Sequence, residues 1–429
     1  MSLRAGCFAA FLLACGARPD PGAQGQSPGS DASAPDVAPQ PTTPPTPPPP
    51  PLPLESTPVR IALGAITPDV EYTFTIPPNA LAFNVALTGG QLSVDVAVKK
   101  LVSPTGVVVL DQAVPAGGNH EVTVGLNGTA AAESPQTDAK GAMPLTPGTW
   151  TVVFSGPRDA KLVGSVVVQV TDDGKFHGGL LDMHVYVPDN LDVKGIPVTA
   201  STAQSNADIE DRVAAFFART ALHAAVYRGI VTYHRIAPTY HMIDDATELA
   251  RAFQESKVVP DGTQAIHVVF TESITFAPGH QAWGIASGIP GASTRSGTVA
   301  SGVALAFLGD TPEEDAEALE HEIGHFFGLS HTTEFQDGLH DPLIDTPTCD
   351  MIDLMACPDN VDVMFPTLIQ APELTQFTLA QSTIFATNPA VRLFRDGKHG
   401  NGKSIAQKVP HPPSARVSSY RCVDGVIRN

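Results

Sequence analysis

The stretch His321-Glu-Ile-Gly-His-Phe-Phe-Gly-Leu-Ser-His331 decides which fold and which chemistry to expect of this 429-residue chain. The preceding Thr311-Pro-Glu-Glu314 predicts a helix start, with Thr at the N-cap, Pro at the first position and Glu three residues after the cap. On that helix His321 and His325 are four residues apart, so both imidazoles leave one face and can bind the same metal ion. The apolar face of the helix consists of Ala316, Leu319, Ile323 and Phe326.

The residues beside these two histidines supply a base and a third ligand. Glu322 can reach a water molecule held by the metal. Gly328 can adopt the left-handed conformation that ends a helix, and the chain can then turn back and bring in His331 as a third nitrogen ligand. Three imidazoles and one water form the open, catalytic type of zinc site.

Such a site predicts hydrolysis of a peptide bond without a covalent intermediate. Zn²⁺ lowers the pKa of water and polarises a carbonyl oxygen. Glu322 would take the proton as general base and pass it to the leaving amine. The alternative is a structural helix with stray histidines, which leaves the spacing of these residues to chance.

Residues 177–387 around this motif predict an α/β layer domain. Strand and helix patterns alternate along the segment, which is typical of an open, mostly parallel sheet. A helix is expected from about Ser205, which together with Asp208 would form its capping box. The apolar positions of that helix are Ile209, Val213, Phe216 and Phe217, and the expected strands lie at 183–187, 230–236, 265–271 and 302–308.

Residues 59–172 predict an all-β sandwich domain. Short alternating apolar runs are separated by turn signals such as Pro147-Gly148, with no helical period between them. The runs lie at 81–87, 92–98, 105–110, 150–154 and 163–170. No cysteine or nucleophile pattern occurs here, so we expect a spacer, a binding module or a folding aid.

The N-terminus predicts export. Residues 1–15 combine Arg4 with a short apolar run, as a signal peptide does. Leu-Leu-Ala-Cys15 resembles a bacterial lipobox, which implies cleavage before Cys15 and lipidation of its thiol; an ordinary secretory signal is the alternative. Residues 16–58 are a Pro-rich linker, with Pro47 to Pro51 in a row, that we expect to be disordered and partly polyproline II.

Composition excludes several classes of protein. Against 25 Lys and Arg stand 44 Asp and Glu, a net charge of −19, so no basic footprint for nucleic acid exists. No apolar stretch of about 18 residues occurs, which excludes a spanning helix. After processing three cysteines remain. Cys349 and Cys357 could form a disulfide that braces the segment between them, or Cys422 could pair with either.

The eleven-residue motif resembles that of the metzincin zinc metallopeptidases. The strings ALEHEIGHFFGLSHTTE and DPLIDTP most resemble the pappalysin-like (cytophagalysin-type) branch, in which a Thr commonly follows the third His, as Thr332 does here. The resemblance covers about residues 179–387 and implies a metzincin-like (zincin) catalytic domain with a Met-turn beneath the zinc. The best match to the Met-turn is Asn360-Val-Asp-Val-Met364-Phe-Pro366, so Met364 would pack under the ligands without binding metal.

One position departs from the family pattern. Enzymes of this branch often carry a Tyr two residues after the Met, which helps to hold the transition state, and here that position is Pro366. Either another group does that work or the zinc acts alone.

Three further features have weaker meanings. The acidic loop with Asp337, Asp341 and Asp345 could hold Ca²⁺, because hard cations prefer carboxylate oxygens, or it could be a solvated loop of turn-forming Asp. His184, His234 and His267 lie in expected strands and are interpreted as structural residues. Residues 388–429 are basic and irregular, and we expect a C-terminal extension on the surface.

The sequence thus favours an exported zinc metalloendopeptidase acting on protein or peptide substrates. Lipid on Cys15 would hold it at the cell envelope, in the outer membrane or at the cell surface, or the protein would be released. The alternative is a surface binding or adhesion lipoprotein whose peptidase-like domain is inactive. A zinc hydrolase of non-peptide substrates is a third reading. Substrate preference, activation and oligomeric state cannot be read from the sequence.

Overall fold

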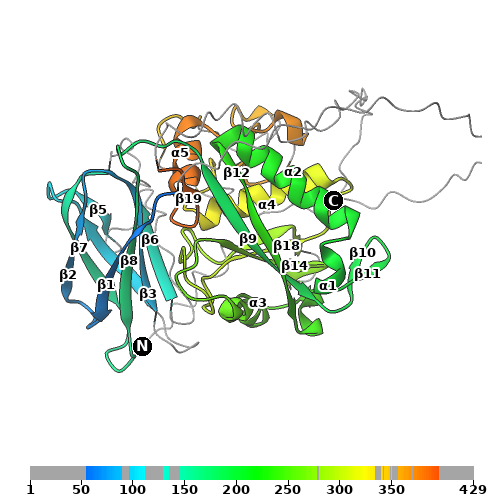
Figure 1. Cartoon of the computed structure of the whole chain (residues 1–429), viewed down its shortest axis with the longest axis horizontal. Coiled ribbons are helices and arrows are strands. Elements are labelled where there is room, and N and C mark those ends of the chain that lie inside the picture. Colours follow the sequence, from blue (N-terminus) through cyan, green and yellow to red (C-terminus); the bar gives the residue numbers. More distant parts are fainter. Residues whose placement is uncertain are drawn as a thin grey trace, which may run out of the picture.

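The computed structural model describes residues 55–88, 96–111, 129–134, 145–277, 280–333, 340–341, 343–347, 349, 356–368 and 371–395. The expected signal peptide with Cys15, most of the linker, Asp337 and Cys422 lie outside these residues. In Figure 1 an all-β part stands on the left of a larger part in which helices flank a sheet. Among the described residues no helix combines the length and apolarity needed to cross a membrane.

The all-β part contains two four-stranded antiparallel sheets, with strand orders β1-β8-β3-β6 and β2-β7-β4-β5. One apolar core lies between them, because alternate residues of each strand point inward. The rings of Phe83 and Trp150 meet edge to face in this core, with centroids 4.9 Å apart. The strands are β1 Val59–Ala65, β2 Glu71–Ile76, β3 Ala80–Thr88, β4 Ala97–Val102, β5 Val108–Asp111, β6 Thr129–Ser134, β7 Gly148–Ser155 and β8 Val163–Val170.

The larger part is a mixed α/β structure around one main sheet, in the order β12-β9-β14-β18-β17. The first four strands are parallel, and β17 ends the sheet as an antiparallel strand beside β18. The strands of this sheet are β9 Gly179–Pro188, β12 Val226–Ile236, β14 Ile266–Thr271, β17 Gly284–Ala286 and β18 Val303–Ala306. Short strands elsewhere are β10 Leu191–Val193, β11 Ile196–Val198, β13 Met242–Ile243, β15 Ser273–Ala277 and β16 His280–Ala282.

Helices cover both faces of this sheet (Figure 1). Helices α2 (Ala207–Ala224) and α4 (Pro312–Phe326) pack on the face that carries Met183, Val185 and Val187. Helix α3 (Ala246–Gln254) packs on the opposite face, against Tyr186. Two further α-helices of the described residues are α1 (Ala200–Ala203) and α5 (Leu379–Thr387).

The start of α2 differs from expectation. Its N-cap is Asn206, whose side chain accepts a hydrogen bond from the Ile209 backbone N–H at 3.0 Å. The Ser205–Asp208 capping box is therefore wrong, because Asn fills the same role one residue later. Ser205 instead donates to the Thr202 carbonyl at the end of α1.

The expected boundaries at residues 58 and 388 also need correction. Glu55 forms a β-bridge with Phe394, so at least the last residues of the expected linker belong to the folded part. The first residues of the expected surface extension are buried: Val391 and Leu393 are fully covered, and β19 (Arg392–Leu393) pairs with β9. Apolar side chains of this segment complete the core, which its basic composition concealed.

The all-β part contacts the α/β part through the loop at 287–302. The Asn84 amide of β3, which is 1% exposed, donates to the Gly291 carbonyl at 3.2 Å. Ala86 packs with Ala292 and Ala300 in a small buried cluster. Because a buried amide and close-packed small residues lie at this contact, the two parts are joined by a packed interface.

Candidate metal centre

Helix α4 begins as its sequence predicts. The Thr311 hydroxyl accepts from the Glu314 backbone N–H at 3.2 Å, and the Glu314 carboxylate accepts from the Thr311 N–H at 3.2 Å. Together with Pro312 at the first position this capping box fixes the register of the helix. The register places His321 and His325 on one side of the last turns.

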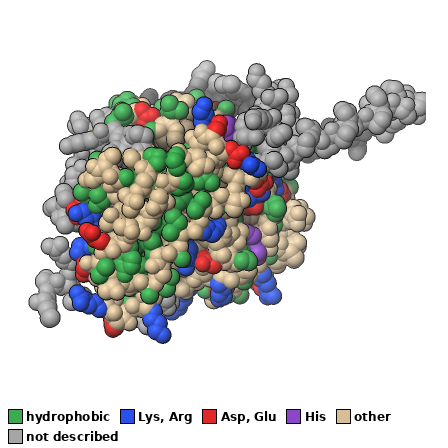
Figure 2. Space-filling view, turned by 60° about the vertical axis from the view of Figure 1, so that its left-hand side comes forward, with side chains coloured by type: hydrophobic (Ala, Val, Ile, Leu, Met, Phe, Trp, Pro, Cys, Tyr) green, Lys and Arg blue, Asp and Glu red, His purple; other side chains and the backbone are tan. Residues whose placement is uncertain are grey.

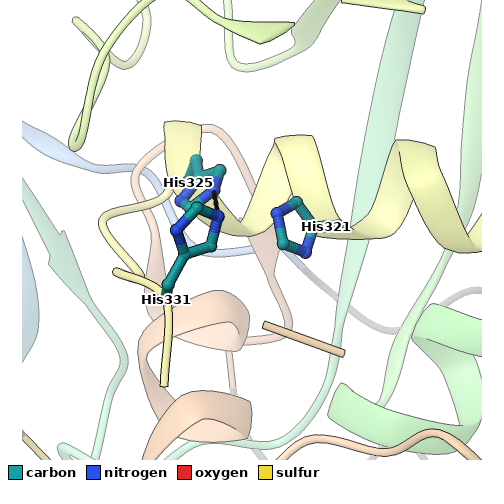
Figure 3. Close-up of side chains that lie close together, drawn as sticks. All are labelled: His321, His325 and His331. Atoms are coloured by element: carbon teal, nitrogen blue, oxygen red, sulfur yellow. Dashed lines mark hydrogen bonds between the residues drawn. The ribbon is translucent and has the colours of Figure 1, made fainter. Parts of the chain in front are cut away.

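His321, His325 and His331 converge on one point (Figure 3). One ring nitrogen of each lies within 4.8 Å of the others, and the Nε2 atoms of His325 and His331 are 3.1 Å apart. The chain turns at Gly328, whose φ of 103° is open to glycine and strained for other residues. The Leu329 N–H then bonds the Gly324 carbonyl at 2.9 Å, which brings the following residues back under the helix.

Backbone carbonyls orient two of the three imidazoles. Nδ1–H of His321 donates to the Val363 carbonyl at 2.7 Å, and Nδ1–H of His325 donates to the Leu329 carbonyl at 2.7 Å. A carbonyl only accepts, so the proton sits on Nδ1 and the Nε2 lone pair is left for a metal. Burial lowers the pKa of His321 to about 3 and that of His325 well below its usual value, so both imidazoles are neutral at pH 7.

Glu322 lies beside the three imidazoles and below strand β17. Its exposure is 6%. A Cβ on Gly284 would lie 2.4 Å from Glu322 Cγ, so only glycine fits at this point of β17. Burial raises the pKa of Glu322 to about 8, and a hydrogen bond from the Ala286 backbone N–H acts in the opposite direction. A nearby cation would favour the carboxylate form of this group.

Met364 packs beneath the group of imidazoles. It is fully buried, and its sulfur would lie 2.5 Å from a Cβ on Gly324, in the middle of the motif. The Met364 carbonyl accepts from the Thr332 N–H at 3.1 Å, and its own N–H donates to Asp362 at 2.7 Å. The turn at Met364 therefore holds the segment after the third histidine.

Two buried ion pairs join α4 to α2. Asp315 of α4 bonds Arg212 at 2.5 Å, and it also accepts from the Trp283 indole N–H at 2.8 Å. Glu320 bonds Arg219 at 2.7 Å and His223 at 2.9 Å. Sequence reasoning missed these residues. Their only sequence signal is a charge on a helix face that otherwise packs against the core, and nothing in the sequence shows which partner each one has.

The segment before the Met-turn contains the disulfide Cys349–Cys357. In the expected cation loop, the Asp345 carboxylate accepts from the Thr378 hydroxyl at 3.1 Å and the Ala380 N–H at 3.0 Å, at the start of α5. Asp341 accepts from the Thr346 hydroxyl and the Leu343 N–H. Asp341 therefore has local partners, as a turn-forming residue does, whereas Asp345 binds the start of a helix more than thirty residues later.

A hollow opens beside Glu322. Its wall is made of helix residues on one side and the segment after the Met-turn on the other. The lining consists of Ala318, His321, Glu322, Phe365, Pro366, Thr367 and Leu368. Pro366, which occupies the position where a Tyr was expected from the family pattern, is thus a wall of this hollow and carries no hydrogen-bond donor.

Comparison with known proteins gives limited results. No family model matches the chain, and no curated protein matches it. Among solved structures, archaemetzincin from Methanopyrus kandleri is 17% identical and covers 48% of this chain and 94% of its own, with a TM-score of 0.29. Metalloproteinase-II from Bacteroides fragilis is 12% identical and covers 51% of this chain and 63% of its own, with a TM-score of 0.26. These scores are too low to assign a family.

Proposed function

We propose that this chain is a zinc-dependent endopeptidase with His321, His325 and His331 as the metal ligands and Glu322 as the general base. The observation that carries the proposal is the convergence of three buried imidazoles with a carboxylate at their side. Three nitrogen ligands on one side leave the other side of a metal open for water and substrate, which is the arrangement of catalytic zinc.

The donor set fits Zn²⁺. Neutral imidazoles suit this ion, and the separation of 3.1 Å between the Nε2 atoms of His325 and His331 is close to the ~3.3 Å expected of two nitrogens at tetrahedral zinc. The carbonyls of Val363 and Leu329 that hold the Nδ1 protons would keep both rings aimed at the ion. When bound, the metal supplies Lewis acidity and a water of lowered pKa.

Glu322 does the proton chemistry in this proposal. As a carboxylate it accepts a proton from the attacking water and then delivers it to the leaving amine nitrogen. Its burial, and the Ala286 N–H that bonds it, fix the carboxylate next to the ligands. No covalent bond to the protein forms at any stage.

The surroundings favour an extended peptide as substrate. Strand β17 ends the main sheet, directly above Glu322. An extended chain can add to a sheet edge through backbone hydrogen bonds, with specificity from side-chain subsites.

Export and anchoring remain part of the proposal. The signal-like residues 1–15, with lipidation at Cys15, would place the enzyme at the cell envelope, and the Pro-rich linker would hold it away from the membrane. The Cys15→Ser chain could not carry this lipid, so it should lose the membrane association of the wild type in cell fractionation.

Calcium is a further part of the proposal, at the acidic loop with Asp337, Asp341 and Asp345, because hard cations prefer carboxylate oxygens. Burial raises the pKa of Asp341 to about 8, and the neighbouring carboxylates of Asp362 and Asp345 act in the same direction. A bound cation would favour the carboxylate form of Asp341. Ca²⁺ should raise the melting temperature of the wild type and not that of Asp341→Asn.

Metal removal tests the peptidase proposal. The mature chain would be stripped with a chelator and mixed with a peptide library, and products would be followed by mass spectrometry. Cleavage that disappears with the metal and returns with about one Zn²⁺ per chain supports the proposal. Cleavage that persists in the stripped protein contradicts it. A chain that binds zinc and cleaves nothing favours the binding or adhesion alternative.

A further inference from the structure

A second group of histidines lies on the other face of the main sheet. His184 of β9 is paired in register with His267 of β14, and Tyr186 of β9 is paired with His234 of β12. Side chains alternate along a strand, and Tyr186 packs on the α3 side. His184 therefore points to that side too, away from α4 and from the group of His321, His325 and His331.

Two ring nitrogens in this group face one another closely. His184 Nδ1 and His234 Nε2 are hydrogen-bonded at 2.8 Å, with either ring as the donor, and a bound ion would replace the proton between them. Two nitrogens at about 2.0 Å from one ion are ~2.8 Å apart when they are neighbours in a square-planar arrangement, and ~3.3 Å apart in a tetrahedron. The pair thus fits neighbouring ligands of a tetragonal ion without a change of backbone.

The neighbouring rings hold both imidazoles in place. Tyr186 stacks on His234 with centroids 5.1 Å apart, and His267 stacks on His184 with centroids 5.5 Å apart. The Tyr186 hydroxyl and His267 Nδ1 are hydrogen-bonded at 2.9 Å, and both residues are buried. A site whose ligands are already oriented loses little entropy when an ion binds.

The two facing histidines are also accessible and neutral. His184 and His234 are partly exposed, so an ion can reach them from solvent. Burial lowers the pKa of both, that of His184 to about 4. A neutral imidazole with its proton on the remote nitrogen offers a lone pair, so binding at pH 7 needs only a change of tautomer in one ring.

We propose that His184 and His234 form a second metal site, which binds a divalent transition metal of the Cu²⁺ or Ni²⁺ type. Imidazole nitrogen suits these ions, and both accept tetragonal geometry. Solvent completes the coordination, since the pair lies at the surface of the sheet. His267 and Tyr186 position the ligands and do not bind. The site is separate from the zinc centre and does not depend on peptidase activity.

The test is a Cu²⁺ titration of the zinc-loaded mature chain, followed by electron paramagnetic resonance and by the zinc content. The matched variants are His184→Gln with His234→Gln, and His241→Gln. His241 is a partly exposed histidine at the end of the short 3-10 helix Pro238–His241, and its Nδ1–H donates to the Pro238 carbonyl. The wild type and His241→Gln should bind Cu²⁺ with the signature of two nitrogens while retaining zinc. The double variant should bind it at least ~100-fold more weakly.

Three results overturn the proposal: equal Cu²⁺ affinity in the double variant, a copper signal with no two-nitrogen signature, and copper uptake only in exchange for zinc. If the double variant fails to fold by circular dichroism, His234→Gln alone replaces it. Ni²⁺ should then raise the melting temperature of the wild type and not that of His234→Gln, and an equal rise in both contradicts the site.

Discussion

The interiors of the two parts are built from different chemistry. Among the described residues of the all-β part, the buried side chains include amides and hydroxyls and no charged group. The α/β part buries several ionisable side chains on and around helix α4. They are Arg212, Arg219, Asp315, Glu317, Glu320 and Glu322. Burying a charge costs free energy, which is recovered only when a partner is placed well.

The difference indicates where precise positioning matters. The apolar core of the sandwich needs volume and pattern, which several sequences could supply. The ion pairs of α4 fix this helix against α2 at defined atoms. Asp315 lies near the start of α4, and Glu320 lies next to His321. Such pairs favour one arrangement over others more than they add stability.

The largest stability effect is expected from breaking one of these pairs. Arg219→Met would leave Glu320, which is fully buried, without its cation, at a cost of about 3–5 kcal/mol in the free energy of unfolding. Arg219→Met combined with Glu320→Met should lose clearly less, because no charge is then stranded. Chemical denaturation of the three proteins measures both. Equal losses in the single and double variants would show that packing, and not charge, holds the two helices.

Gly291→Ala tests how the loop at 287–302, which forms the contact between the two parts, packs against the end of α4. A Cβ here would lie 2.0 Å from the Phe326 ring at the end of α4, and the Gly291 N–H bonds the Phe326 carbonyl at 2.9 Å. We expect a loss of about 1–3 kcal/mol from overpacking, together with faster loss of zinc to a chelator. An unchanged zinc release rate at reduced stability would show that the interface does not reach the metal centre.

The sequence predicted those elements of both parts that a local pattern of apolar residues determines. The alternating runs at 81–87, 150–154 and 163–170 correspond to β3, β7 and β8, and the apolar spacing of Ile209 and Val213 corresponds to the buried face of α2. Local pattern decides such elements. The spacing of the motif likewise brought three histidines together, because a capped helix and a glycine turn fix their directions.

Long-range pairing could not be predicted in the same way. Arg212 and Asp315 are more than one hundred positions apart, and nothing local links them. The burial of Val391 and Leu393 depends on pairing with the start of β9, which is far away in sequence. The N-cap of α2 was misassigned by one residue, because Ser, Asn and Asp are all good caps and stand close together there.

A pH series sharpens the comparison at the second histidine group. Burial lowers the pKa of His267 to about 3, from about 6.5 in the unfolded chain. The stability that this neutral histidine contributes is therefore present above pH 6.5 and is lost as the pH falls from 6.5 towards 3. Unfolding free energies of the wild type and His267→Gln between pH 8 and 5 should converge at the acid end. Parallel curves would contradict this.

The smallest effect is expected at an exposed pair of the sandwich. Lys99 bonds Asp69 at 2.6 Å, but both side chains are about half exposed. Water screens such a pair, so Lys99→Met should leave the melting temperature unchanged within error. If Lys99→Met destabilises the protein as much as Arg219→Met does, the exposed ion pair contributes as much stability as the buried one, which contradicts this account.

Hydrolysis by Glu322→Gln, measured beside the bound zinc, tests the central claim most directly. Glu313→Gln is the matched control, because Glu313 is an exposed residue on the same helix. Our account predicts about one zinc in all three proteins, full activity in the wild type and Glu313→Gln, and a fall of roughly 10²–10⁴-fold in kcat for Glu322→Gln. Zinc-bound Glu322→Gln that cleaves peptides at the wild-type rate would contradict it.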